Sequence, residues 1–289
     1  MKKAFQVLTI LSLIVLMSAF TKKAPITVFM IGDSTMANKD TTGGKQERGW
    51  GMMLQQYFKS GVVVDNHAVN GRSSKSFIDE GRWQKVLDKI KPGDYVIIQF
   101  GHNDEKPALD RHTDPGSTFD ANLSRFVLEA REKGANPILC DAVVRRNFYR
   151  QVDSSVDDES LRNTVYEDEK VNSDTLIDTH GDYLLSPRNV ASQFNVPFIR
   201  ANQITHDLEQ SLGIEGSRKL HMWFKPGEHP SVPNGRKDNT HYNIYGGTVV
   251  AALLADEISR QVPALKKYID RKKIKKIKKS LKLFQKDLE

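Results

Sequence analysis

The stretch "FMIGDSTM", residues 29–36, leads from an apolar segment into a turn with Ser34 at its bend. The apolar residues are typical of a buried β-strand, and Gly32 and Asp33 are residue types that end strands. A turn that only reverses the chain needs no hydroxyl group, whereas a nucleophile does. We therefore predict that Ser34 lies on a strand-to-helix turn, with its backbone N–H at the positive end of the helix that follows.

The same apolar pattern recurs along the chain. Strands are expected at 26–31, 62–69, 94–100, 136–140 and 196–199, and helices at 48–59, 82–90, 118–133, 182–194 and 242–262. Near-continuous apolar strands that alternate with helices indicate a parallel sheet covered on both faces. The sequence thus predicts an α/β protein, a three-layer αβα fold of the flavodoxin-like kind with a five-stranded parallel sheet.

The first residues have the pattern of an export signal. Lys2 and Lys3 precede an apolar run that is short and interrupted by polar residues. We expect residues 1–23 to be a cleavable signal peptide and the protein to be periplasmic or secreted, with an uncleaved membrane anchor as the alternative. The single cysteine, Cys140, forms no disulfide within the chain, which suits an exported bacterial protein.

The positive charge of the chain is concentrated at its C-terminal end. The net charge is +7, but residues 264–289 hold eleven Lys or Arg and three Asp or Glu, so the remainder is nearly neutral. Apolar residues recur in this tail at helical spacing, at positions 274, 277, 281, 284 and 288. The pattern predicts a basic helix that we expect to dock on its own domain. Contact with an anionic surface, such as a membrane, is the alternative.

Residues 24–263 are expected to form the folded domain. Within it, the segment 149–177 is polar and acidic and interrupts the alternation of strands and helices. We interpret this segment as an insertion at the C-terminal side of the sheet, where inserted loops often shape a binding site.

Chemically useful residues follow the predicted strands. "NGRSS" (70–74) comes after the second strand, "GHND" (101–104) after the third, and "DNTH" (238–241) before the last helix. Ligands bind open parallel sheets outside the carboxyl ends of the strands. We therefore expect these segments to meet Ser34 at one edge of the sheet.

The residues in these segments are suited to acyl transfer through a serine nucleophile. His241 can take the Ser34 proton, because the ordinary pKa of histidine, about 6.5, lies near neutral pH. Asp238 is three residues before His241 and can hold the imidazole in the required tautomer. The backbone N–H groups of Ser34 and Gly71 and the side-chain amide of Asn103 can form the oxyanion hole.

Together the segments resemble the signature blocks of the GDSL or SGNH hydrolases. The Ser, Gly, Asn and His of that family correspond to Ser34, Gly71, Asn103 and His241, and its acid corresponds to Asp238. The resemblance implies the SGNH hydrolase fold and a Ser-His-Asp esterase that forms an acyl-enzyme. We expect no cofactor and no metal.

Details of the blocks are closer to the rhamnogalacturonan acetylesterases than to the lipase-like members. "GRSS", "GHND" and "DTHGDY" (178–183) carry this resemblance, and Thr35 follows the serine where the family name implies Leu. The resemblance therefore implies removal of acetyl groups from pectic polysaccharide.

The segment before the Asp/His pair is a candidate for binding the sugar. Residues 221–241 contain several Pro and Gly, which predicts an irregular loop. Trp223 could stack on a sugar ring or belong to the core, and Arg236 and Lys237 could pair with a uronate carboxylate. The candidate substrate-binding residues are Arg72, Trp223, Arg236 and Lys237, and Arg145 and Arg146 could extend a basic rim.

Other functions remain open at this point. The substrate could be acetylated xylan, acetylated sialic acid or a lipid, although no apolar loop near the motifs suits an acyl-chain tunnel. The intact Ser/Asp/His set argues against a non-catalytic carbohydrate-binding protein. Phosphate-binding glycine motifs are absent from the sequence, and His221, His229 and His241 lack the spacing of a zinc site. The expected partner is an acetylated acidic polysaccharide or oligosaccharide, not a nucleic acid.

Overall fold

A computed structural model describes residues 25–150 and 169–288 of the chain. The predicted signal peptide, 1–23, lies outside the described residues, as does the central part of the acidic insertion, 151–168. The predictions for these two segments stay predictions.

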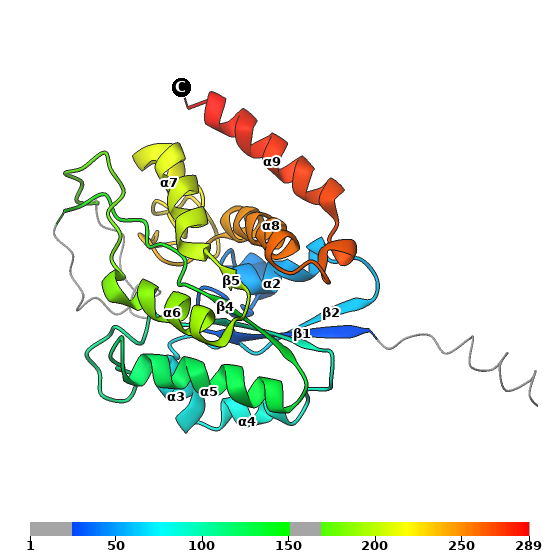
Figure 1. The fold of residues 1–289 in the computed structure, drawn as a ribbon. Coiled ribbons are helices and arrows are strands. Elements are labelled where there is room, and N and C mark those ends of the chain that lie inside the picture. The colour runs from blue at the N-terminus through cyan, green and yellow to red at the C-terminus, as the bar shows by residue number, and fades with distance from the viewer. Residues whose placement is uncertain (1–24, 151–168, 289) are drawn as a thin grey trace, which may run out of the picture.

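A five-stranded sheet forms the centre of the domain (Figure 1). The strands are β1 (Ile26–Gly32), β2 (Val62–Asn66), β3 (Tyr95–Gln99), β4 (Asn136–Cys140) and β5 (Phe198–Ile199). All neighbouring pairs are parallel, and the order across the sheet is β2-β1-β3-β4-β5. The predicted α/β fold with a five-stranded parallel sheet is confirmed.

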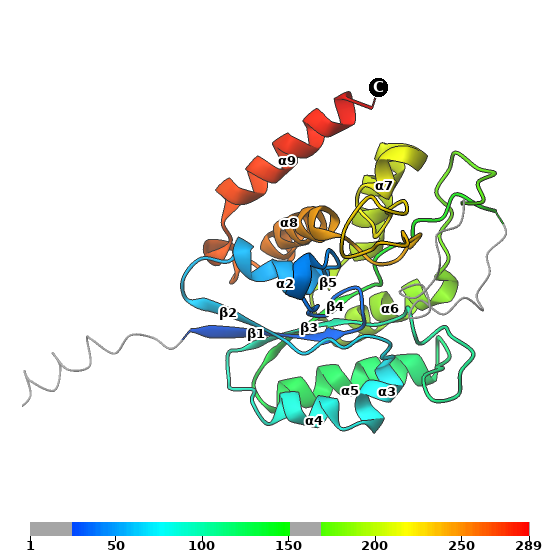
Figure 2. The same ribbon diagram turned by 180° about the vertical axis from the view of Figure 1, so that it is seen from behind.

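Helices cover both faces of the sheet and complete the three layers (Figures 1 and 2). On one side lie α2 (Trp50–Leu54), α7 (Ala201–Arg218), α8 (Ile244–Gln261) and α9 (Arg271–Lys286). On the other side lie α3 (Ser74–Asp79), α4 (Arg82–Leu87), α5 (Thr118–Glu132) and α6 (Leu185–Phe194). The short 3-10 helices are η1 (Thr42–Gly44), η2 (Gln55–Tyr57), η4 (Gly181–Leu184) and η5 (Lys266–Tyr268).

The strands are apolar on both faces because both faces are buried. In β1, Val28 and Met30 share a core with side chains of α2 and α8, whereas Phe29 and Ile31 share one with side chains of α3 and α5. The chain passes from β1 to β2 on one side and then to β3 on the other side. The carboxyl end of β1 is therefore a topological switch point, where open α/β sheets bind their ligands.

The basic tail forms α9 and packs on the domain, as we expected. Asp270 caps the helix, because its carboxylate accepts hydrogen bonds from the backbone N–H groups of Lys272 and Lys273. Ile274 and Leu281 are buried in the same core as the side chains of α8. Among the described residues, the helices are all too short or too polar to cross a membrane.

Candidate active site

Ser34, His241 and Asp238 lie in one hydrogen-bonded line at the carboxyl edge of the sheet. Ser34 follows β1, and the other two residues lie just before α8. His241 Nε2 is 2.9 Å from Ser34 Oγ, and His241 Nδ1 is 2.8 Å from Asp238 Oδ2. An ionised carboxylate only accepts hydrogen bonds, so Nδ1 carries the hydrogen and Nε2 is left to accept from the Ser34 hydroxyl. This is the relative arrangement of nucleophile, base and acid in a catalytic triad.

The surroundings of Asp238 keep its carboxylate ionised. Burial alone raises the pKa of Asp238, but the charges of His241 and Arg236, together with hydrogen bonds, hold the pKa well below its usual range. The backbone N–H groups of Thr240 and His241 each donate to Oδ1 at 2.9 Å. The Arg236 guanidinium donates to Oδ2, the same oxygen that faces the imidazole.

The turn at Ser34 is held by a backbone hydrogen bond from the Ala37 N–H to the Asp33 oxygen at 3.0 Å and by side chains. Asp33 Oδ1 accepts hydrogen bonds from the Thr35 N–H at 2.9 Å and from Thr35 Oγ1 at 2.7 Å. Gln99, the last residue of β3, donates to Thr35 Oγ1 at 2.8 Å. The hydroxyl of Thr35 therefore has a structural use that a Leu could not fulfil. The prediction that a helix begins at Ser34 is wrong, since a single hydrogen-bonded turn follows Asp33 and the next α-helix begins at Trp50.

Gly71 and Asn103 lie on the loops that follow β2 and β3. Gly71 has a φ of 71°, which favours glycine. Asn103 Nδ2 donates to the backbone oxygen of Arg72 at 3.3 Å, so the two loops are in contact beside Gly71. The role of Gly71 and Asn103 in an oxyanion hole stays a prediction.

Asp104, which the sequence analysis did not single out, ties the same two loops together. Its carboxylate accepts from Ser74 Oγ at 2.5 Å, from the Ser74 N–H at 3.0 Å and from the Gly101 N–H at 3.1 Å. Thr113 Oγ1 donates to it at 2.9 Å. Burial raises the pKa of Asp104 to about 7, although the hydrogen bonds from Ser74 and Thr113 favour the charged form. The signal was present in the sequence, since Asp104 and Ser74 are the last letters of two of the motifs.

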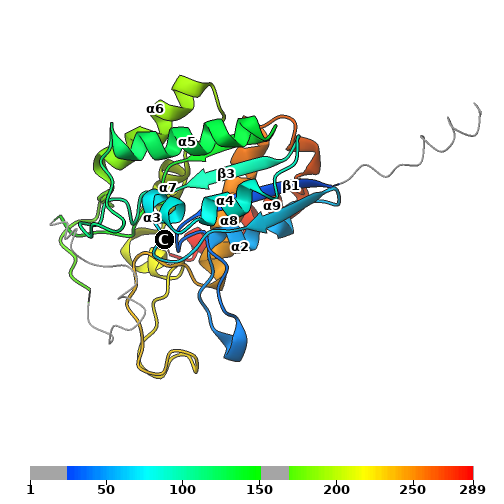
Figure 3. The same ribbon diagram turned by 90° about the horizontal axis from the view of Figure 1, so that it is seen from below.

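Arg236 is buried and paired within the protein, which favours a role in holding Asp238 over the predicted contact with a uronate of the substrate. Its side chain donates to Glu47 Oε2 at 3.0 Å and to Asp238. Glu47 pairs with Lys39 at 2.8 Å, and Lys39 Nζ donates to Asn70 Oδ1 at 2.6 Å. Figure 3 shows that the loop with η1 and the loop before α8, which supply these partners, project from the same end of the domain. A chain of paired charges thus joins Asp238 to the loop after β2.

The other predicted substrate-binding side chains also have partners within the protein. Trp223 Nε1 donates to Asn239 Oδ1 at 2.6 Å, and the Arg218 guanidinium lies 4.7 Å from the ring centre. The ring therefore has partners within the protein, but Trp223 is only half-buried and is in none of the hydrophobic core clusters, so both of its predicted roles stay predictions. Arg72 pairs with Glu80 at 3.2 Å. The remaining cations of the predicted rim also interact within the protein: Arg145 with Glu105, Arg146 with Glu169, and Lys237.

The loop that carries the acid and the base is closed at its base by backbone pairing. Two isolated antiparallel bridges form, His221 with Tyr242 and Phe224 with Arg236. Asn243 then caps α8, because its side chain accepts from the Gly246 N–H. A Cβ at Gly246 would lie 1.9 Å from the Leu220 oxygen, so only glycine allows the helix to approach this loop. Asp238 and His241 consequently lie on the returning leg of a hairpin-like loop.

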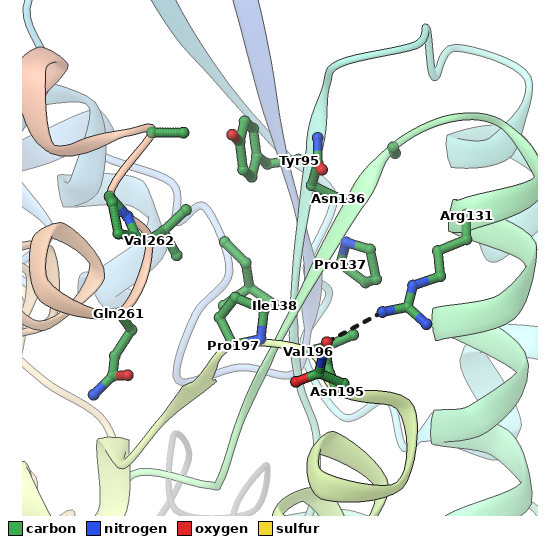
Figure 4. Close-up of a pocket in the computed structure, with 13 residues that line it drawn as sticks. Tyr95, Arg131, Asn136, Pro137, Ile138, Asn195, Val196, Pro197, Gln261 and Val262 are labelled. Carbon is green, nitrogen blue, oxygen red and sulfur yellow. Dashed lines mark hydrogen bonds between the residues drawn. The ribbon is translucent and has the colours of Figure 1, made fainter.

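A second place that could hold a ligand lies at the opposite edge of the sheet (Figure 4). This pocket of about 360 Å³ is lined by the first residues of β3 and β4, Tyr95 and Asn136, and by Val262 after α8. Arg131 at its wall donates to the Asn195 oxygen at 3.3 Å. The pocket is thus separate from the triad. In residues 25–150 and 169–288, no three His, Cys, Asp or Glu side chains gather as a metal site would require.

A parallel sheet with a Ser-His-Asp line at its carboxyl edge is the arrangement of a serine hydrolase. Comparison with known families agrees with it, since residues 30–233 match the "GDSL-like Lipase/Acylhydrolase family". The chain belongs to this family. It is 39% identical over 247 residues to the rhamnogalacturonan acetylesterase RhgT of Bacillus subtilis (strain 168), a match that covers 86% of this chain and 95% of that protein.

Two further comparisons are informative. The chain is 31% identical over 236 residues to the probable rhamnogalacturonan acetylesterase YesY of Bacillus subtilis (strain 168), covering 80% of this chain and 91% of that protein. The crystal structure of YxiM from Bacillus subtilis superposes with a TM-score of 0.61 at 24% identity, covering 84% of this chain and 58% of that chain. The structural likeness shows that the fold is shared.

Proposed function

We propose that the protein is a serine esterase that removes O-acetyl groups from rhamnogalacturonan. The observation that carries this proposal is the line from Ser34 Oγ through His241 to Asp238, with 2.9 Å and 2.8 Å between the hydrogen-bonded atoms. The choice of substrate is supported by the two Bacillus subtilis relatives, of which RhgT is named a rhamnogalacturonan acetylesterase and YesY a probable one.

In the first half of the reaction, Ser34 Oγ attacks the carbonyl carbon of the acetyl ester while His241 Nε2 takes the hydroxyl proton. The carbonyl oxygen becomes an oxyanion, to which the N–H groups of Ser34 and Gly71 and the Asn103 amide would donate. The bond between the carbonyl carbon and the sugar oxygen then breaks. The sugar leaves as an alcohol with the proton from His241, and the acetyl group stays on Ser34.

In the second half, water attacks the acetyl-enzyme as His241 takes a proton from it. Collapse of the second tetrahedral intermediate releases acetate and returns the proton to Ser34. Asp238 keeps Nδ1 protonated and stabilises the imidazolium in both halves. Its low pKa suits this role, because a carboxylate that stays ionised orients the base and does not take its proton.

The depth of the triad supports a small acyl group. Ser34 and His241 are each 1% exposed, and Asp238 is 0% exposed. An acetyl group is compact enough to reach a nucleophile at that depth, whereas a long acyl chain would need an apolar tunnel. This argues against the lipase-like alternative among the esterases considered above.

The predicted export signal bears on where the enzyme acts. An enzyme that acts on a plant polymer must meet it outside the cytoplasm, and the lysines and apolar run at the start of the chain are the pattern of a secretory signal. We therefore propose a periplasmic or secreted location for this enzyme.

The test is acetate release from a panel of substrates by the purified protein. Acetylated rhamnogalacturonan, acetylated xylan, acetylated sialic acid and a long-chain p-nitrophenyl ester are compared at equal ester concentration. We expect the wild-type protein to have its highest kcat/KM on acetylated rhamnogalacturonan. We expect the Ser34→Ala variant to release no acetate from any of the substrates. A higher kcat/KM on acetylated xylan would show that xylan, and not rhamnogalacturonan, is the preferred substrate. Equal rates of acetate release by wild type and Ser34→Ala would overturn the mechanism.

A further inference from the structure

The charges of α9 are held in a fixed position on the domain. Ile274 and Leu281 of this helix are buried against the domain. In addition, Lys278 Nζ forms a hydrogen-bonded ion pair with Asp256 Oδ2 of α8 at 2.5 Å. Near the N-terminal end of the helix, Lys273 Nζ donates a hydrogen bond to the backbone oxygen of Gln56 at 3.0 Å. The helix is thus anchored along its length on the outer side of α8 (Figures 1 and 2).

The side of α9 that faces away from the domain is a row of cations. These exposed residues are Arg271, Lys272, Lys275, Lys276, Lys279, Lys282 and Lys286. None of the seven forms an ion pair with an acidic side chain of the described residues. Residues three and four apart lie about 5–6 Å from each other on a helix, so the row presents closely spaced positive charges with no internal compensation.

The packing of α9 argues against a lipid bilayer as the partner of this row. A helix that lies in a membrane interface buries an apolar face among the lipid chains. In α9 the apolar stripe is already used, because Ile274, Ile277, Leu281 and Phe284 pack on the domain. Leu283 is also exposed, at 56%, but one leucine among the cations is no continuous apolar face, so the remaining surface suits a flexible polyanion in water.

The C-terminal end of α9 contacts the start of α8, the helix that follows the Asp238–His241 segment. The ring of Phe284, close to the C-terminal end of α9, lies 6.0 Å from the ring of Tyr245 in an edge-to-face contact. Tyr245 is in the first turn of α8, four residues after His241. The helix therefore leads along the domain toward the edge of the sheet at which the triad lies.

We propose that the outward row of α9 is a binding surface for the carboxylates of a galacturonate polymer, which it retains beside the catalytic site. The row is the region of the chain in which the net positive charge is concentrated, and a galacturonate chain is a repeating anion. The choice of polymer rests on the proposed function. Several weak contacts on one polymer add up through high effective concentration, so the surface raises the amount of substrate at the site without touching the reacting ester.

The test is binding of the full chain to polygalacturonate that carries no acetyl groups and is therefore no substrate. In one variant three exposed lysines of the row are reversed, Lys275→Glu, Lys279→Glu and Lys282→Glu. The control reverses three exposed lysines on the other side of the sheet, Lys85→Glu, Lys91→Glu and Lys133→Glu. Both variants change the net charge equally. Both should keep the wild-type melting temperature and the rate on p-nitrophenyl acetate.

We expect the α9 variant to lose about ten- to a hundred-fold in affinity for polygalacturonate and the control less than about threefold. Added salt should remove the difference, because it screens exposed charges. On acetylated rhamnogalacturonan the α9 variant should show a raised KM and an unchanged kcat. Lys→Gln changes at the same three positions should give a smaller loss of the same kind, which covers the case in which the Glu variant unfolds.

Equal losses in the two variants would overturn the proposal, since net charge and not α9 would then determine binding. Tighter binding of wild type to anionic lipid vesicles than to polygalacturonate would also overturn it. Binding to polygalacturonate is measured without esterase activity. A protein that binds the polymer through α9 but releases no acetate from rhamnogalacturonan would refute the proposed function and leave this surface standing.

Discussion

Asp238 Oδ2 accepts hydrogen bonds from two cationic or potentially cationic groups at once, the imidazole of His241 and the guanidinium of Arg236. The arginine was predicted to face the substrate, but it stands behind the acid of the triad. A carboxylate between two such donors is fixed in position and kept ionised. Arg236 thus acts on the reaction through Asp238 and is a positioning residue.

Replacing Arg236 with Gln should destabilise the protein by about 3–5 kcal/mol, because Asp238 and Glu47 would then be buried without their shared cation. The free energy of unfolding from urea titration measures this loss. The matched change Arg72→Gln, at an exposed ion pair with Glu80, should cost less than about 1 kcal/mol. Equal losses at the two positions would contradict the assignment of Arg236 to a buried network.

The loss in Arg236→Gln should depend on pH. The pKa of Asp238 is lower in the folded protein than its unfolded value of about 3.9. Ionised Asp238 therefore stabilises the fold above about pH 3.9, and this stabilisation is lost as the pH falls from there through the folded pKa. Without Arg236 this contribution is smaller. The difference in Tm between wild type and variant should therefore be largest near about pH 7 and narrow below about pH 4. A difference that grew toward acid pH would contradict this sign.

Glu47→Gln should lower kcat, because Glu47 holds Arg236 at 3.0 Å and Lys39 at 2.8 Å. The double variant with Arg236→Gln should lose less than the sum of the two single losses, because both changes break one network. Rates on p-nitrophenyl acetate give the coupling. Strictly additive losses would show that Glu47 and Arg236 act separately.

Ser34→Ala should reduce kcat by about three orders of magnitude or more with no loss of fold, since Ser34 Oγ is the proposed nucleophile. His241→Ala should be similarly severe, and the double variant should be no worse than either single one, because triad members act as a unit. Circular dichroism and acetate release provide the two measurements. Additive effects of the two changes would argue against a shared role.

Asn103→Ala should lower kcat by about 10²–10³ while KM changes little, because an oxyanion donor acts mainly in the transition state. Gly71→Ala should impair the same step, since alanine is strained at the φ of 71° that this loop adopts. If Asn103→Ala changed only KM, the Asn103 amide would contribute to binding of the substrate and not to stabilising the oxyanion.

The strands were predictable because their apolar runs are local and continuous. The helices α3 and α7 were not. α3 begins with a capping box in which Ser73 and Ser76 bond to each other's backbone N–H, a signal hidden within a motif interpreted as a loop. α7 contains Gly213 with a φ of 64°, which breaks its helical pattern. The strand expected at 196–199 is reduced to Phe198–Ile199, since little of it pairs with β4.

The residues of the triad line were predictable from local sequence, as the strands were, since each lies next to the end of a strand or the start of a helix. The partners of Arg236 were not, because Glu47 is 189 residues away in the sequence. No local pattern distinguishes a lysine or glutamate that will be buried in such a pair from one that stays in solvent. The pairing of Arg236 within the protein could not be predicted for this reason.

The two backbone bridges at the base of the loop before α8 separate its tip from the acid and base. Residues 225–235 lie beyond the bridge between Phe224 and Arg236, while Asp238 and His241 lie inside it. Insertions and deletions at an exposed tip cost little free energy when the stem stays paired. Residues 225–235 can therefore change in length and sequence during evolution, and with them the choice of glycan, while Asp238 and His241 keep their positions.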